Sequence, residues 1–165
     1  MTQQRLSFLG HPLDVGYTVA DLSNLLTTKG ASKLVTFVHA NAWAFAKKQP
    51  EYLDQLNKMD LVIPASLDIA AAAQKLHNVT CTDICFENHS LAAPFFQAAV
   101  ANTVSLMLIG GQPVIDERTH DKLTTFYPGL NIITTANGYG DIAPKIALIL
   151  EKKPDCVLVD YPTGK

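Results

Sequence analysis

The sequence is poor in charge and in cysteine, and each shortage excludes a class of protein. Charged residues make up 17% of the chain, and the net charge is −2 with no dense run of Lys or Arg. We therefore expect no nucleic-acid partner recognised through bulk charge. No apolar run approaches the roughly 20 residues that span a bilayer, and the first residues lack the apolar stretch of a signal peptide. We expect a cytoplasmic protein with reduced cysteines.

Recognisable catalytic and metal-binding motifs are missing too. The chain has neither a G-x-S-x-G elbow nor a Walker motif. Cys81 and Cys85 lie four residues apart but have no histidine at zinc-finger spacing, so we interpret both as small buried apolar side chains. His77, His89 and His120 are scattered and are expected at the surface. The sequence therefore predicts no metal and no cofactor.

Apolar residues, by contrast, make up 48% of the 165 residues, enough for a core without disulfides. Short apolar runs alternate with helical patterns along the chain. This alternation predicts an α/β, Rossmann-like fold with a mostly parallel sheet and helices on both faces, as one domain over residues 1–165. The expected strands are 6–9, 33–39, 60–63, 104–109, 131–134 and 155–159. The expected helices begin near residues 21, 41, 50, 67, 83, 112 and 141, and Gly10-His11-Pro12 is expected to end the first strand.

The most informative segment is a strand–helix–strand unit with glycines after both strands. The first strand runs into Gly110-Gly111, and the second leads to Gly138-Tyr139-Gly140. Open parallel sheets bind ligands at this edge, where glycines let backbone N–H groups approach a phosphate and a helix start favours an anion. The pattern predicts a phosphate or substrate site at Gly110, Gly111, Gln112, Gly138 and Tyr139. A tight turn that binds nothing is the alternative.

Other polar residues follow predicted strands more directly. His39 comes at the end of one strand, and a histidine, with an ordinary pKa of about 6.5, suits a general base. Asn41 and Ser66 begin the helices that follow two strands, so we include both as substrate-binding candidates. A buried structural histidine is the alternative for His39.

Several stretches resemble one family in their order and spacing. They cover essentially the whole chain and are Leu9-Gly10-His11-Pro12-Leu13-Asp14, Ala46-Lys47-Lys48-Gln49-Pro50-Glu51, Asp60-Leu61-Val62-Ile63-Pro64, Val79-Thr80-Cys81-Thr82-Asp83, Leu108-Ile109-Gly110-Gly111-Gln112-Pro113, Tyr127-Pro128-Gly129-Leu130 and Gly138-Tyr139. They resemble the WecG/TagA/CpsF family (glycosyltransferase family 26). The resemblance implies transfer of a UDP-linked N-acetylhexosamine to a lipid-linked acceptor at the cytoplasmic face of the membrane. It also implies a homo-oligomer.

The chain departs from the family at its chemistry. Where the family has P-D-G, with the presumed catalytic base, this sequence has Pro64-Ala65-Ser66, and Ala65 accepts no proton. Phe37 and His39 replace a T-x-N pattern, Asn78 replaces an Arg, and the ending Tyr161-Pro162-Thr163-Gly164-Lys165 lacks the Gln of G-A-P-K-Q-E.

Three residues are candidates for a substitute base. Three interpretations of the function also stay open. His39 is one, Asp68 follows Ala65 in the first turn of a helix, and Asp83 keeps the family's Asp. Both carboxylates have a structural alternative. Asp68 would stabilise the amino terminus of its helix, and Asp83 would be a helix N-cap. The first reading is an active glycosyltransferase. The second is a pseudoenzyme that only binds nucleotide sugar or a partner, and the third is a small-molecule-binding α/β module of unrelated function.

Overall fold

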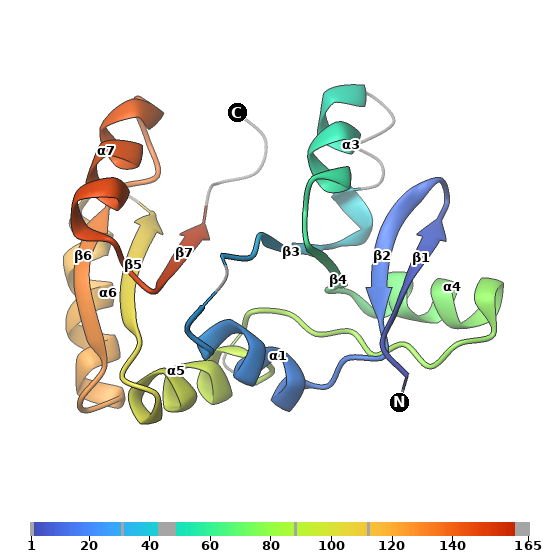
Figure 1. The fold of residues 1–165 in the computed structure, drawn as a ribbon, viewed down its shortest axis with the longest axis horizontal. Helices are drawn as coiled ribbons and strands as arrows, with labels where there is room; N and C mark the ends of the chain where they lie inside the picture. The colour runs from blue at the N-terminus through green and yellow to red at the C-terminus, as the bar shows by residue number, and fades with distance from the viewer. Residues whose placement is uncertain (1, 31, 43–48, 88, 112, 161–165) are drawn as a thin grey trace. The chain divides into compact units, whose positions relative to one another are not determined.

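A computed structural model describes residues 2–30, 32–42, 49–87, 89–111 and 113–160 (Figure 1). The chain forms two compact units, one of residues 1–23 and 30–94 and one of residues 24–29 and 95–165. The division passes through α1 (Val19–Thr27) and α5 (Ala92–Ala101). Each unit is described here by itself. The interpretation of residues 1–165 as one glycosyltransferase-like domain stays a prediction.

The first unit combines an antiparallel hairpin with a parallel strand pair (Figure 1). β1 (Gln4–Phe8) pairs with β2 (His11–Val15), and β3 (Val35–Val38) pairs with β4 (Leu61–Pro64). β2 packs beside β4 and also contacts α3 (Pro50–Asn57). α4 (Leu67–His77) follows β4 and packs against it.

The hairpin corrects our prediction that Gly10-His11-Pro12 ends the first strand. Leu9 and Gly10 both have positive φ, at 51° and 86°. This is the conformation of the two-residue turns that match the twist of a β-hairpin. His11 therefore begins a second strand, and Leu13 and Val15 on that strand are buried.

The core of the first unit gathers apolar residues from the hairpin, both parallel strands, α3 and α4. Its buried members are Phe8, Leu13, Val15, Val38, Leu56, Val62, Ile69, Ala70, Ala73 and Cys81. The alternating burial of β1 and the small Ala face of α4 allow these elements to approach closely. Removing such side chains from water is the main force that holds the unit together.

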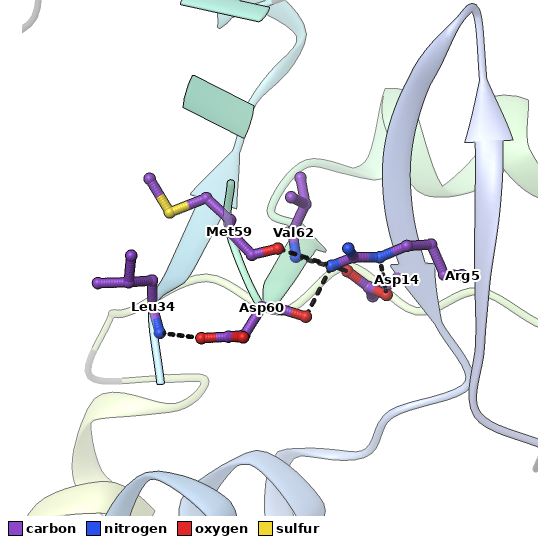
Figure 2. Close-up of polar contacts among 6 residues, drawn as sticks. All are labelled: Arg5, Asp14, Leu34, Met59, Asp60 and Val62. Atoms are coloured by element: carbon purple, nitrogen blue, oxygen red, sulfur yellow. Dashed lines mark hydrogen bonds and ion pairs between the residues drawn. The ribbon is translucent and has the colours of Figure 1, made fainter. Parts of the chain in front are cut away.

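One buried carboxylate joins the hairpin to the outer edge of β4 (Figure 2). Asp14 accepts hydrogen bonds from Arg5 Nε at 2.9 Å and Nη2 at 2.8 Å, and from the Val62 N–H at 2.7 Å. Arg5 also donates to the carbonyl oxygens of Met59 and Asp60. The hydrogen-bonded carboxylate raises the pKa of the Arg5 guanidinium. The side chain of Asp14 thus replaces a strand partner for β4.

The second unit is built on a parallel sheet in the order β6-β5-β7 (Figure 1). β5 (Ser105–Gly110) lies between β6 (Asn131–Ala136) and β7 (Cys156–Asp160). α6 (Pro113–Phe126) connects β5 to β6 and packs on β6. α7 (Ile142–Lys152) connects β6 to β7. The predicted α/β, Rossmann-like class, with parallel strands flanked by helices, is confirmed.

The predicted helix from Asp83 to about Val100 is wrong in its first half. Residues 83–87 and 89–91 are not helical, and α5 begins at Ala92, with Pro94 in its first turn. A proline is tolerated there because the first-turn N–H groups have no partner within the helix. Of the helix expected from Asn41, residues 40–42 are helical and residues 43–48 lie outside the described residues. No helix within the described ranges is long and apolar enough to cross a bilayer.

Candidate functional site

The carboxyl edge of the β3–β4 pair collects most of the predicted catalytic residues. Val38 pairs with Pro64 at the end of the two strands, and the Ala65 N–H donates to the Val38 carbonyl at 2.9 Å. The Ile84 N–H donates to the Pro64 carbonyl at 2.8 Å. Three chain segments therefore meet at this edge, following β3, following β4, and around residue 84.

The catalytic candidates at this edge do not form a preassembled set. His39, Asn41 and Asp68 are exposed, and Asp83 is half-buried. Within the described ranges, no hydrogen bond or ion pair joins His39, Asp68 and Asp83 to one another. Asp83 does not cap a helix, contrary to its structural alternative, because the segment that follows it is irregular.

Ala65 and Ser66 occupy the place where the family resemblance puts the base. Ala65 is 4% exposed, so its methyl group belongs to the core. Ser66 has the extended conformation of a helix N-cap before α4, but its hydroxyl makes no cap hydrogen bond. Its buried Oγ has no hydrogen-bond partner among the described residues. Buried hydroxyls are normally satisfied, so the contacts of the described residues leave this oxygen unexplained.

Burial and charge keep the Cys81 thiol protonated beside this edge. Burial first, and then the negative charge of Asp83, raises its pKa to about 11. A thiol in that state is no nucleophile at neutral pH. Cys81 is buried, as expected for a small apolar side chain, whereas Cys85 is only half-buried.

In the second unit, the glycine corner is closed by backbone packing. A Cβ on Gly110 would lie 2.5 Å from the carbonyl oxygen of Asp160, at the end of β7. A Cβ on Gly138 would lie 3.2 Å from the Cα of Gly110, and the Gly138 N–H donates to the Gly111 carbonyl at 3.1 Å. The Gly110 contact requires glycine whether or not a ligand binds, and the Gly138 contact leaves little room for a side chain. Gln112, another residue of the predicted phosphate or substrate site, lies outside the described residues.

A hollow of about 330 Å³ lies beside the loop that follows β6. It is lined by Ala136, Asn137, Tyr139, Asp141, Pro144, Lys145 and Leu148. This volume is at the lower end of the roughly 300–1,000 Å³ of small-molecule sites. Of the predicted substrate residues, Tyr139 lines the hollow, and neither Gly110 nor Gly111 does.

A buried lysine, which the sequence analysis missed, holds this loop. Lys145 is 8% exposed, and its Nζ donates to the carbonyl oxygens of Tyr139 at 2.6 Å, Asp141 at 3.1 Å and Gly140 at 3.4 Å. The Tyr139 N–H donates to the Asn137 side-chain oxygen. A lysine in the first turn of a helix opposes the helix dipole, and this mismatch is the pattern that would have singled it out.

Comparison with known proteins places the chain in a family. The family model described as "Glycosyl transferase WecG/TagA/CpsF family" matches residues 6–164, nearly the whole chain. The chain belongs to this family. The comparison with curated proteins found no match.

Membership in the WecG/TagA/CpsF family confirms the resemblance drawn from the motifs. It implies a glycosyltransferase-type function in cell-surface polysaccharide synthesis, with a nucleotide sugar and a lipid-linked acceptor as substrates. It also removes the support for a binding module of unrelated function. The roles of individual site residues remain predictions.

Proposed function

We propose that this WecG/TagA/CpsF family member binds a UDP-linked N-acetylhexosamine and transfers the sugar to a hydroxyl of a lipid-linked acceptor. The observation that carries this proposal is the family match over residues 6–164. In the reaction, a base takes the proton of the acceptor hydroxyl and the oxygen bonds to the anomeric carbon. The bond from that carbon to the diphosphate breaks, and UDP leaves.

The diphosphate is assigned to the start of α6 and to the loop after β6. Gly111, directly after β5, has a φ of 66°, and the 14-residue helix α6 begins at Pro113. A helix start of this kind presents free N–H groups and positive potential to an anion. The N–H groups of Gly138 and Tyr139 already donate within the protein, so they contribute loop shape rather than donors. Tyr139, 45% exposed, offers its ring and hydroxyl.

His39 is our first choice of base. It is exposed directly after β3, at the edge where Ala65 stands in place of a carboxylate. Asp68 is also exposed but occupies the first turn of α4, where a carboxylate has a sufficient structural role. Asp83 is half-buried and ranks third. The unpartnered hydroxyl of Ser66 and the exposed amide of Asn41 are assigned to substrate.

A second candidate function is binding without turnover. Ala65 favours it, because a buried methyl group stands where the resemblance places the base. In that case the domain retains the nucleotide sugar, or a partner glycosyltransferase, and releases no UDP. We keep it as the alternative because His39 and Asp68 are accessible at the same edge.

Calorimetry with UDP and UDP-N-acetylhexosamines, combined with chromatography of released UDP, tests both functions. Binding with UDP release that depends on acceptor supports transfer, and binding without release supports the alternative. No binding at millimolar concentration contradicts both. We expect His39→Ala to lower turnover at least about 100-fold with unchanged UDP affinity, since general bases contribute roughly 10²–10⁴-fold. His120→Ala, in the middle of α6, is the matched control.

The family resemblance also leads us to propose a homo-oligomer. Light scattering on the purified chain, over a range of protein concentrations, measures its mass directly. A monomer of 17.9 kDa at every concentration would contradict this proposal.

A further inference from the structure

Three metal-ligating side chains come together on the turn between β4's edge and α5. A thiol sulfur of Cys85, a carboxylate oxygen of Glu87 and a ring nitrogen of His89 all lie within 4.8 Å of one another. His89 Nε2 is 3.2 Å from Glu87 Oε2. The three residues alternate along the chain, so the turn brings them to one side although no zinc-finger spacing is present.

Backbone hydrogen bonds among the described residues connect the two sides of this turn. The N–H groups of Ser90 and Ala92 donate to the Glu87 carbonyl at 3.0 Å, and the Leu91 N–H donates to the Cys85 carbonyl at 3.1 Å. Two buried residues, Ile84 and Leu91, flank the ligands and fix both ends of the turn in the core. Little conformational freedom is therefore left to lose when an ion binds.

The turn is also attached to the strand edge beside Ala65. The Ile84 N–H bonds to the Pro64 carbonyl, and the ring of Phe86 lies 6.2 Å from the ring of Phe37 on β3. Cys85 is half-buried between these attachments, whereas the side chains of Glu87 and His89 are 57% and 77% exposed. The ligands are thus open to an incoming ion from one side.

The chemistry of the three ligands selects the ion. A thiolate and a carboxylate supply two negative charges, and residues 81–92 contain no Lys or Arg to oppose a cation. Sulfur and imidazole ligands favour zinc over magnesium or calcium. In a tetrahedral zinc site, bonds of roughly 2.0–2.3 Å place the ligand atoms about 3.3–3.6 Å apart. The His89–Glu87 pair, at 3.2 Å, is close to this spacing, and the Cys85 sulfur lies within 4.8 Å of both ligand atoms.

We propose that Cys85, Glu87 and His89 bind one Zn²⁺ ion, with the fourth position open to water. This departs from the expectation of no metal, which rested on the lack of a histidine at zinc-finger spacing from Cys81 and Cys85 and interpreted His89 as a surface residue. The bound ion connects three side chains of the turn beside the carboxyl edge of β4. The proposal is independent of nucleotide-sugar binding and stands or falls separately from it.

Cobalt is the direct probe, because a thiolate bound to Co²⁺ gives an absorption band that carboxylate and imidazole ligands do not. The untagged, reduced full chain is titrated with Co²⁺, and Zn²⁺ is then added in competition. We expect a thiolate–cobalt band that Zn²⁺ abolishes at one equivalent. Since the ligands must lose protons, binding weakens as the pH falls.

Variants separate a site from adventitious binding. Cys85→Ser and His89→Ala should each weaken Zn²⁺ on the order of 100-fold or more, while circular dichroism shows that they fold. Cys156→Ser, a half-buried thiol on β7, is the matched control and should keep the band. No band with the unaltered chain overturns the proposal. A band that survives Cys85→Ser or His89→Ala also overturns it. In that case the replaced residue is not a ligand, and His89 and Glu87 form only an exposed ion pair.

Discussion

The attachment of the hairpin to β4 through Asp14 can be tested quantitatively. The N–H groups of Leu61 and Ala65 donate to the carbonyls of Leu34 and Val38, so the Val62 N–H between them points away from β3. Asp14, 4% exposed, accepts that N–H and binds Arg5 through both carboxylate oxygens. Asp14→Ala removes this acceptor from the edge of the strand pair.

The cost follows from what is left without a partner. A buried N–H that loses its acceptor costs about 1–3 kcal/mol. The Arg5 side chain is 42% exposed and keeps its bonds to the Met59 and Asp60 carbonyls, so its share is discounted to about 1 kcal/mol. We expect Asp14→Ala to lower the free energy of unfolding by about 3 kcal/mol. Asp14→Asn should cost about 1.5 kcal/mol, because the amide oxygen still accepts the Val62 N–H.

Urea unfolding followed by circular dichroism measures the loss, and hydrogen exchange of the Val62 amide locates it. That amide should exchange about 100-fold faster in Asp14→Ala, since 1.4 kcal/mol corresponds to a factor of ten. Asp54→Ala, an exposed carboxylate on α3, is the control and should stay within about 0.5 kcal/mol. A loss below about 1 kcal/mol for Asp14→Ala, or unchanged exchange at Val62, would refute this reasoning.

Four further changes test other parts of the chain. A hydrogen bond from the Ser105 N–H lowers the pKa of Asp155 to about 2. The ionised carboxylate therefore contributes about 1 kcal/mol to the free energy of unfolding above pH 4, after allowing for its exposure, and this is lost as the pH falls through 2. In urea unfolding, Asp155→Asn should be less stable than the unaltered chain at neutral pH and equally stable below pH 2. Burial raises the pKa of Cys156 to about 11, so disulfide reagents should modify it slowly at pH 7 until urea unfolds the chain. Gly110→Ala should lose about 1–3 kcal/mol in urea, because its Cβ meets a carbonyl at 2.5 Å, and an unchanged midpoint would contradict that contact. Ala65→Asp should raise UDP release in the chromatographic assay if only the base is missing, and no gain points to binding alone.

The strand–helix–strand unit of β5, α6 and β6 was predictable because its apolar runs are bounded by Gly and Pro. The observed β5, Ser105–Gly110, differs by one residue at each end from the predicted 104–109. β2 was missed because its turn begins with Leu9, a non-glycine residue at a φ of 51° that carries no turn signature. The helix predicted from Asp83 was wrong for a different reason. The backbone N–H of Ile84 bonds to Pro64, a tertiary contact that outweighs local helix propensity.

The candidate site was predictable as a place and only partly as a set of residues. His39 and Ser66 lie at a carboxyl strand edge because parallel strands end together, which the alternation of strands and helices already implies. The role of Gly110 was not readable, because the end of β7 requires a glycine there, just as a phosphate would. The grouping of Cys85 with His89 depends on a turn closed by backbone hydrogen bonds, which leaves no pattern in the sequence.

The position of Ala65 limits where a base can come from. The Ala65 N–H donates to the Val38 carbonyl, and the Ala65 side chain is buried. The backbone is therefore held in place here, and no neighbouring carboxylate can move into the position of the Ala65 side chain. The proposed replacement bases lie elsewhere at the same edge. His39 follows β3 directly, and the Ile84–Pro64 bond brings the segment of Asp83 there. Single substitutions of His39, Asp83 and Asp68, the last in the first turn of α4, therefore test the three proposed bases.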